Sequence, residues 1–351
     1  MKRKSIGIQI KPVGNVCNIA CKYCYARPFL KNYKLMSMDI VETLVKKMCS
    51  YQKNLLFSWH GGEPLFPGLG FYKDVVKIIE KYSDGHDIKH VVQTNGTLID
   101  RDFSRFLVEN KFEVGISLDG TKKTHNINRI TPTGEGTFDR VMKGVDFLRE
   151  FGYNPSVIST VTKETLPYAV ENFDFLIKNG FKKIKFSPVY DSSSDSFSIS
   201  NDEWFEYLKQ VFYRWLEVND DSISIREIDE VIAWFGDEPF DLCSTKNICL
   251  SWASIDPDGE LYPCEYLRSE MSYGNIKDIS IDEMFKGIAF NKFKQKFLHT
   301  PEKCKKCAFY KFCGNGCPAI RVDEMGNLKH DGLYVYCKER HRLYEEIKKH
   351  F

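Results

Sequence analysis

The sequence lacks the features that would place it in a membrane or in the secretory pathway. Its longest uncharged apolar stretches are only as long as a strand, so no transmembrane helix is expected. The basic N-terminus has an apolar stretch that is broken at Lys11, so the core of a signal peptide is missing. The sequence therefore predicts a cytoplasmic protein that does not contact a membrane.

An excess of charge of one sign is also missing. The 351 residues include 50 Lys and Arg against 48 Asp and Glu, which gives a net charge of +2. This balance argues against nucleic acid as the main partner. With 42% hydrophobic and 28% charged residues, disordered and collagen-like chains are excluded as well. The length predicts about two domains.

Cysteine is absent between Cys49 and Cys243, and the twelve cysteines gather on either side of this gap. Three lie close together near the start, and eight follow the gap: Cys17, Cys21 and Cys24, then Cys243, Cys249, Cys264, Cys304, Cys307, Cys313, Cys317 and Cys337. In a reducing compartment, clustered cysteines typically bind metal or carry out redox chemistry. Eight thiolates can complete two four-ligand sites, whereas three leave a site one ligand short. Cys49 falls on the apolar face of a predicted helix and is interpreted as a core thiol.

Strand-like and helix-like segments alternate from residue 5 to about residue 217. Strands are predicted over Ile6–Ile10, Leu55–Trp59, Lys89–Gln93, Phe112–Leu118, Val157–Val161 and Ile184–Ser187. Helices are predicted over Asp39–Tyr51, Phe71–Tyr82, Asp100–Glu109, Thr137–Phe151, Leu166–Asn179 and Asp202–Val218, with Asp39 and Thr137 as N-caps. Six β–α units predict an α/β fold with a parallel sheet, which binds ligands at the carboxyl ends of its strands.

The alternation stops beyond about residue 235. Ser254–Ile255 and Leu261–Tyr262 flank a turn and predict a short hairpin, and Lys338–Phe351 predicts a charged helix. The rest of this part is rich in loops and cysteines, so it is expected to need metal to hold its shape.

The first cysteine group has the spacing C-x3-C-x2-C and follows the first predicted strand. No fourth cysteine is near, so a cubane cluster held by Cys17, Cys21 and Cys24 would keep one iron free. A zinc knuckle, the structural alternative, would need a fourth ligand close by. Together with Gly61-Gly62-Glu63-Pro64 after the second strand, the spacing resembles the radical S-adenosylmethionine (radical SAM) superfamily.

This resemblance implies a partial (β/α)6 TIM barrel and a [4Fe–4S] cluster whose free iron binds SAM, which is cleaved to a 5′-deoxyadenosyl radical. Gly62 and its neighbour would let the backbone approach the methionine moiety, and Glu63 would accept a hydrogen bond from its ammonium group. Matching positions imply further SAM contacts at Tyr23 and Tyr190 for adenine, and at Ser117 and Arg129 for ribose and carboxylate. Ser117, Arg129 and Tyr190 also have ordinary interpretations, as a strand-end polar residue, a surface arginine and a core aromatic.

The eight later cysteines resemble the SPASM extension, which carries two auxiliary [4Fe–4S] clusters. The pattern runs C-x9-G-x4-C from Cys249, then C-x2-C-x5-C-x3-C from Cys304, then Cys337. Family correspondence implies two ligand sets: Cys243, Cys249, Cys264 and Cys317, and Cys304, Cys307, Cys313 and Cys337. Two zinc-ribbon sites are the alternative. Closed clusters take up electrons, so the resemblance implies an oxidative reaction, with a radical SAM core over residues 1–232 and a SPASM domain over residues 233–351.

The whole chain is similar to the anaerobic sulfatase-maturating enzymes, through Gln93-Thr94-Asn95-Gly96 and Cys313-Gly-Asn-Gly-Cys317-Pro318 among other stretches. Those enzymes oxidise a cysteine or serine to formylglycine. The resemblance implies a peptide or protein substrate, an electron donor such as ferredoxin or flavodoxin, and a monomer. Only 16 residues precede Cys17, so no leader-peptide-binding domain is expected there.

Glu265 departs from this family, which carries aspartate directly after the position of Cys264, proposed there to take the proton of the substrate. Glu265 is therefore a candidate general base, and an exposed glutamate beside a cluster is the alternative. The departure leaves open a peptide maturase that forms a thioether or a carbon–carbon cross-link. A structural metal protein or electron-transfer module without radical chemistry is the alternative from another class.

Overall fold

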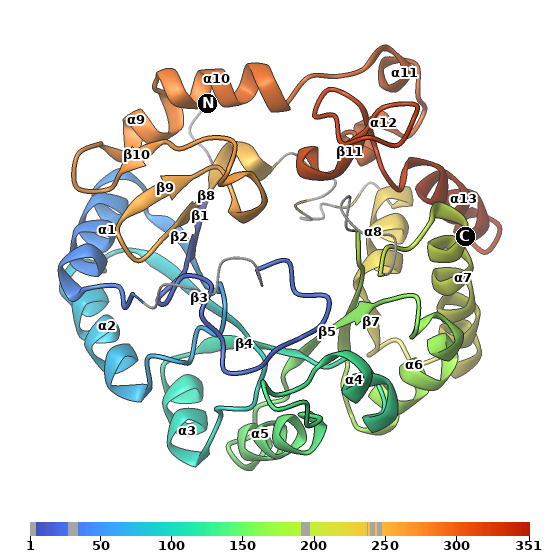
Figure 1. Ribbon diagram of the computed structural model, residues 1–351, viewed down its shortest axis with the longest axis horizontal. Coiled ribbons are helices and arrows are strands. Elements are labelled where there is room, and N and C mark those ends of the chain that lie inside the picture. Colours follow the sequence, from blue (N-terminus) through green and yellow to red (C-terminus); the bar gives the residue numbers. More distant parts are fainter. Residues whose placement is uncertain (1–4, 27–33, 191–196, 237, 239–242, 244–247) are drawn as a thin grey trace.

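A single curved sheet of ten strands organises the molecule, and the helices surround it (Figure 1). The computed structural model describes all residues except 1–4, 27–33, 191–196, 237, 239–242 and 244–247. The strands follow the order β10-β9-β8-β1-β2-β3-β4-β5-β6-β7. Their bounds are β1 (Ile6–Ile10), β2 (Asn54–Trp59), β3 (Asp87–Thr94), β4 (Phe112–Ser117), β5 (Ser156–Val161), β6 (Lys183–Pro188), β7 (Ser224–Ile225), β8 (Trp252–Ile255), β9 (Glu260–Tyr262) and β10 (Gly274–Asn275).

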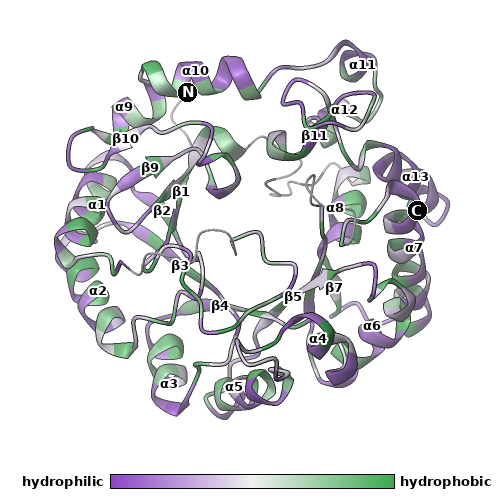
Figure 2. Cartoon of the chain, in the orientation of Figure 1, coloured by the Kyte–Doolittle hydropathy of each residue, from purple (hydrophilic) through white to green (hydrophobic). Residues whose placement is uncertain are grey.

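Strands β1 to β7 are all parallel to their neighbours, so the six predicted β–α units are confirmed as a partial (β/α)6 barrel. The helices after these strands are α1 (Met38–Tyr51), α2 (Leu69–Tyr82), α3 (Arg101–Glu109), α4 (Lys122–Asn128), α5 (Phe138–Glu150), α6 (Ala169–Lys178), α7 (Asn201–Val218) and α8 (Arg226–Phe235). In Figure 2 these helices have apolar faces, coloured green, and polar faces, coloured purple. The sheet buries alternate residues against them, as with Leu55, Phe57 and Trp59 of β2.

Two predicted N-caps and one predicted helix start differ in kind from the structure. The N-cap of α1 is Ser37, whose side chain accepts from the backbone of Ile40, and not Asp39, which lies inside the first turn. Thr137 precedes α5, but its hydroxyl donates to the carbonyl of Arg129 instead of capping the helix. The segment predicted as a helix from Leu166 starts as a 3-10 turn with a proline, and α6 begins only at Ala169.

The C-terminal part continues the same sheet. The predicted hairpin is confirmed as β8 and β9, and β8 also pairs in parallel with β1. The outer elements are α9 (Ile281–Lys286), α10 (Ile288–Phe297), α11 (Glu302–Lys305), α12 (Tyr310–Cys313), β11 (Arg321–Val322), β12 (Leu333–Tyr334) and α13 (Cys337–Lys348). The predicted domain boundary, between residues 232 and 233, falls inside α8. Among the described helices, none has the length and apolar character that a membrane crossing requires.

The interior of the barrel is polar and hollow. A cavity of about 740 Å³ is lined by inward-facing residues of neighbouring strands, including Ser58, Gln93, Gly115 and Lys185. Loops from the carboxyl ends of the strands meet at one end of this barrel, which is where parallel sheets bind their ligands.

Candidate active site

The first cysteine loop lies directly against the Gly61-Gly62-Glu63 turn. The amide of Gly62 donates to the carbonyl of Gly14 at 2.8 Å, and the amide of Glu63 donates to the carbonyl of Val16 at 2.8 Å. A Cβ atom on Gly62 would lie 2.0 Å from that carbonyl oxygen of Val16. Glycine at position 62 is therefore required by the packing of the protein itself, a reason that the sequence did not reveal.

Replacing Gly62 with alanine is expected to displace the cysteine loop, because the clash involves backbone and not a flexible side chain. We expect a loss of about 1–3 kcal/mol in the free energy of unfolding, and a protein that binds less iron at the first site. Thermal unfolding and iron analysis measure the two effects. Gly70→Ala is the matched control, since nothing lies within 4 Å of a Cβ at that position; an equal iron loss in both variants would contradict the explanation.

Glu63 is buried and accepts three hydrogen bonds from the protein. Its Oε1 accepts from the Thr94 hydroxyl at 2.6 Å and the Leu65 amide at 3.0 Å, and its Oε2 accepts from the Asn95 amide at 2.8 Å. Burial raises the pKa of Glu63 to about 7, although these hydrogen bonds lower it. A carboxylate has about four acceptor positions, so Glu63 can still accept from one further donor such as an ammonium group.

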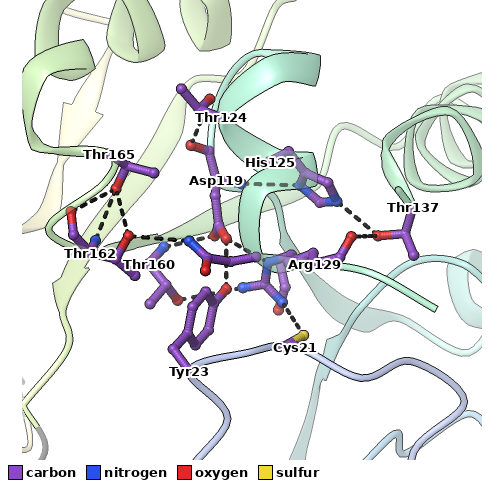
Figure 3. Close-up of polar contacts among 12 residues, drawn as sticks. Cys21, Tyr23, Asp119, Thr124, His125, Arg129, Thr137, Thr160, Thr162 and Thr165 are labelled. Atoms are coloured by element: carbon purple, nitrogen blue, oxygen red, sulfur yellow. Dashed lines mark hydrogen bonds and ion pairs between the residues drawn. The ribbon is translucent and has the colours of Figure 1, made fainter. Parts of the chain in front are cut away.

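Arg129, Tyr23 and Asp119 form a connected polar network beside the cysteine loop (Figure 3). The Asp119 carboxylate accepts from the Tyr23 hydroxyl at 2.6 Å and from Nε of Arg129 at 2.9 Å. Nη1 of Arg129 donates to the sulfur of Cys21 at 3.8 Å. Arg129 is buried, so its interpretation as a surface arginine is wrong. The network connects the carboxyl end of β4 and α4 with the first cysteine group.

Asp119 holds this network in place because its second carboxylate oxygen accepts from the backbone of Thr160, just after the middle of β5, at 2.9 Å. Asp119 is not among the site residues predicted from the sequence. The available signal was an Asp-Gly pair at the end of a predicted strand, where functional side chains gather.

Ser117 and Tyr190 lie apart from this network. Ser117, the last residue of β4, accepts a hydrogen bond from Gln93 at 3.1 Å and lies half-buried. Tyr190 follows β6 and lines a second cavity of about 270 Å³, together with Trp204, Tyr266 and Tyr336.

The three thiols of the first loop have surroundings that suit an iron–sulfur cluster. Asn95 donates to the sulfur of Cys17 at 3.6 Å, and Arg129 donates to that of Cys21. Hydrogen bonds to the sulfurs are among the factors that tune such clusters. Burial raises the pKa of the unligated Cys17 thiol to about 12 and that of Cys21 to about 11. Buried thiols beside hydrogen-bond donors therefore fit thiolate ligands of a cluster.

The eight later thiols fall into two groups in space. Burial and then the thiols of Cys313, Cys304 and Cys307 raise the pKa of Cys337 to about 11. Burial raises the pKa of Cys264 as well, and the thiols of Cys317 and Cys243 also raise it. Cys249 interacts with Cys243, Cys264 and Cys317. These two groups are the ligand sets that the SPASM resemblance implies: Cys243, Cys249, Cys264 and Cys317, and Cys304, Cys307, Cys313 and Cys337.

Neither group converges on a point suited to one metal ion. Among the residues that the structure describes, no three His, Cys, Asp or Glu side chains are placed to hold a single ion. Zinc requires four ligands at about 2.3 Å from one centre, whereas a cubane spreads its thiolates over separate irons.

Glu265 is buried, so its interpretation as an exposed glutamate is wrong. Its Oε2 accepts from Nζ of Lys11 at 2.6 Å, and the same nitrogen lies 3.1 Å from Oδ1 of Asp256. Asp256 also pairs with Arg268. Burial raises the pKa of Glu265, although the Lys11 ammonium lowers it. Lys11 is not among the site residues predicted from the sequence; the available signal was a lysine that directly follows a fully buried strand.

This buried ion pair connects the SPASM segment with the start of the cysteine loop. Lys11 directly follows β1, and Glu265 directly follows the thiol of Cys264. One residue further, the ring of Tyr266 packs on that of Tyr25, with centroids 5.0 Å apart. Tyr25 in turn follows Cys24, so Glu265 lies between the two cysteine systems.

Comparison with known proteins assigns the class. The radical SAM superfamily model matches residues 12–176, and an iron–sulfur cluster-binding domain, SPASM, matches residues 243–308. The chain therefore carries a radical SAM domain and a SPASM domain, and its homologues indicate an enzyme. These domains indicate SAM and iron–sulfur clusters as its cofactors.

The relatives of this chain include named anaerobic sulfatase-maturating enzymes. The cysteine-type anaerobic sulfatase-maturating enzyme of Clostridium perfringens (strain 13 / Type A) is 29% identical over 97% of this chain and 95% of its own length. The serine-type enzyme of Bacteroides thetaiotaomicron is 28% identical over 98% of this chain and 90% of its own. The solved structure of native anSMEcpe with bound AdoMet and Kp18Cys peptide matches with a TM-score of 0.89 and 27% identity, over 99% of this chain and 98% of that one.

Proposed function

We propose that this enzyme oxidises a cysteine or serine side chain in a peptide or protein substrate to formylglycine. The observation that carries the proposal is the match, over nearly the full length of both chains, to a structure that holds AdoMet and a peptide. The relatives named as cysteine-type and serine-type sulfatase-maturating enzymes support the same reaction.

Three [4Fe–4S] clusters are part of the proposal. Cys17, Cys21 and Cys24 hold the SAM-binding cluster, whose fourth iron takes SAM. Cys243, Cys249, Cys264 and Cys317 hold one auxiliary cluster, and Cys304, Cys307, Cys313 and Cys337 hold the other. When bound, the first cluster and SAM supply a 5′-deoxyadenosyl radical that removes a hydrogen atom from the substrate. The division into a core over residues 1–232 and an auxiliary-cluster part over residues 233–351 follows these ligand sets.

The residues around the first loop bind and orient SAM. Glu63 accepts from the SAM ammonium group with its remaining acceptor position, and Arg129 faces the SAM carboxylate. Gly62 keeps the turn close enough for this contact, while Ser117 and Tyr23 contact ribose and adenine. Tyr190 completes the adenine contacts from the end of β6. The hydrogen bonds of Arg129 to Asp119 and Cys21 support this arrangement, because they hold its side chain beside the cysteine loop.

Glu265 is the general base in this proposal. Its carboxylate takes the proton of the substrate thiol or hydroxyl, and Lys11 holds it in position by an ion pair of 2.6 Å. A base of this kind must lie within hydrogen-bond reach of the proton that it removes. The position of Glu265 between Cys264 and the first cysteine loop supports the role.

The finer statements about partners and location are also proposals. The electron donor is a ferredoxin or flavodoxin, and the enzyme acts as a monomer. A cytoplasmic location is supported by the twelve free cysteines, since oxidising compartments favour disulfides.

Anaerobic incubation with SAM, a reductant and a Cys-x-Pro-x-Arg peptide tests the function. We expect 5′-deoxyadenosine and a peptide whose mass falls by the difference between a cysteine residue and its aldehyde product. The serine peptide is the matched comparison, and a peptide with alanine in that place is the control. Mass spectrometry of the peptide and chromatography of 5′-deoxyadenosine are the measurements.

The departure from aspartate to Glu265 favours one alternative, a maturase that forms a thioether or carbon–carbon cross-link in another peptide. If the enzyme makes abundant 5′-deoxyadenosine but changes neither sulfatase peptide, this alternative replaces formylglycine formation as the proposed function. A colourless protein that contains zinc and makes no 5′-deoxyadenosine would instead establish a structural metal protein and overturn the proposal.

A further inference from the structure

The near-neutral net charge hides a strongly basic segment. Between residues 286 and 311 the sequence has eight lysines and one acidic residue, Glu302. The lysines are Lys286, Lys292, Lys294, Lys296, Lys303, Lys305, Lys306 and Lys311, and all eight are exposed. They lie on α9, α10, α11 and α12 and on the loops between these helices, at the outer rim of the molecule in Figure 1.

Half of these lysines are paired with an acidic side chain. Lys286, Lys296, Lys303 and Lys305 form ion pairs with Asp282, Glu270, Glu324 and Glu302. Within the part of the chain that the structure describes, no ion pair involves Lys292, Lys294, Lys306 or Lys311. The segment therefore keeps an uncompensated positive charge that faces solvent, in the four unpaired lysines.

Lysines flank one of the two later thiol groups in sequence and not the other. Cys304 lies between Lys303 and Lys305, Cys307 follows Lys306, and Cys337 is followed by the exposed Lys338. In contrast, no lysine is adjacent in sequence to Cys243, Cys249, Cys264 or Cys317. Exposed lysines that neighbour cysteines in sequence are thus found at the group of Cys304, Cys307, Cys313 and Cys337.

This thiol group also reaches the surface. Cys307 is half-buried, and its sulfur lies 3.3 Å from Nε2 of His341 on α13. On the inner side, Nη1 of Arg340 donates to the sulfur of Cys313 at 3.3 Å. A thiol group that is partly open to solvent and has exposed lysines beside it in sequence is suited to electron exchange with a protein that docks from outside.

We infer that the exposed lysines of residues 292–311, together with Lys338, form the docking surface for a small acidic electron-carrier protein, a flavodoxin or a ferredoxin. The inference rests on the proposed function for the cluster ligands and adds the place where the carrier binds. Long-range attraction between a positive and a negative surface raises association rates and fixes the docking orientation.

Conversion of a cysteine side chain to a thioaldehyde would release two electrons and two protons. One electron and one proton would leave together as the hydrogen atom that the 5′-deoxyadenosyl radical takes up, and the other proton would go to the general base. The second electron would pass to the redox group that Cys304, Cys307, Cys313 and Cys337 would hold and from there to the docked, oxidised carrier, which would be reduced by one electron.

The test measures electron transfer and binding without any peptide substrate. The cluster-loaded enzyme is reduced with dithionite, desalted anaerobically, and mixed with oxidised flavodoxin, whose semiquinone is followed by absorbance. For the variant Lys292→Ala/Lys294→Ala/Lys306→Ala/Lys311→Ala, we expect the second-order rate constant at low salt to fall on the order of 10-fold. The affinity for flavodoxin, measured by anaerobic calorimetry, is expected to fall in parallel. In about 0.5 M salt, the rate constant of the wild-type protein is expected to fall close to that of the variant.

The control removes the same charge elsewhere. Lys73, Lys143, Lys163 and Lys178 are exposed and lie on or near α2, α5 and α6, away from α11 and α12. Their fourfold alanine variant is expected to keep at least about half of the wild-type rate. If the fourfold docking variant binds less iron than the wild type, Lys292→Ala/Lys294→Ala on α10 takes its place, because neither residue is adjacent to a cysteine.

Three results would overturn the inference: a wild-type rate in the docking variant, an equal loss in the control, or tighter binding of a short DNA duplex than of flavodoxin. Failure of the proposed function is a separate result, since it appears as an unmodified peptide in the peptide assay and leaves the flavodoxin measurements intact.

Discussion

Replacing Cys24 with alanine is expected to abolish cleavage of SAM. The first loop supplies three thiols, and a cluster with two thiolates has lost one of the three corners that hold it to the protein. We expect 5′-deoxyadenosine formation to fall by more than roughly 100-fold, because even residues that only support a metal ligand contribute 10–100-fold. The measurement is chromatography of 5′-deoxyadenosine after anaerobic reconstitution with iron, sulfide, SAM and dithionite.

Cys49→Ala is the matched control. Cys49 lies on α1, half-buried, and packs against the core. Its loss is expected to cost about 1 kcal/mol of stability by removing packed atoms, with SAM cleavage within a few-fold of the wild type. If Cys24→Ala cleaved SAM as well as Cys49→Ala does, the first loop would not be the SAM-binding site, and the assignment of the whole barrel end would fail with it.

The barrel was predictable from the sequence because its signals are local. Apolar strands such as Ile6–Ile10 alternate with amphipathic helices, and each is recognisable within a window of about 11–18 residues. The pairing of β8 with β1 was not predictable in this way. It joins residues that are far apart in sequence, and a four-residue strand carries no signal of its partner.

The site was predictable only in part, for a related reason. The cysteine spacing and the glycine turn identify themselves in the sequence, but their support comes from other elements. Asp119 became recognisable as the anchor of Arg129 only when β4, β5 and α4 were brought together. Lys11 and Glu265 are 254 positions apart, so only the fold reveals that they form a buried pair.

Replacing Glu265 with glutamine is expected to separate SAM cleavage from product formation. Glutamine has nearly the same size and can still accept a hydrogen bond from Lys11, but it cannot take a proton from the substrate. We expect peptide oxidation to fall by about 10²–10⁴-fold, the usual contribution of a general base. Production of 5′-deoxyadenosine is expected to stay within a few-fold of the wild type. Both products are measured in the same anaerobic reaction.

Glu260→Gln makes the same chemical change a few residues away. Glu260 lies on β9 and contacts Ser272 instead of Lys11, so peptide oxidation is expected to stay near the wild-type rate. Equal oxidation by Glu265→Gln and Glu260→Gln would remove Glu265 from the reaction. Glu265→Asp, which introduces the residue that the family carries, is expected to keep more peptide oxidation than Glu265→Gln but less than the wild type. The carboxylate is retained, but the side chain is about one methylene shorter.

Lys11 provides an independent check on the same pair. Lys11→Met leaves Glu265 and Asp256 buried without the shared ammonium, and breaking a buried pair in this way costs about 3–5 kcal/mol. Chemical unfolding measures this loss. In the double variant Lys11→Met/Glu265→Gln the uncompensated charge of Glu265 is gone, so part of the stability is expected to return, as a non-additive term in the cycle. In the double variant, part of the stability would return because the neutral amide relieves the buried charge. Peptide oxidation would not return, because the amide supplies no base. This combination of results distinguishes a catalytic carboxylate from a merely structural one.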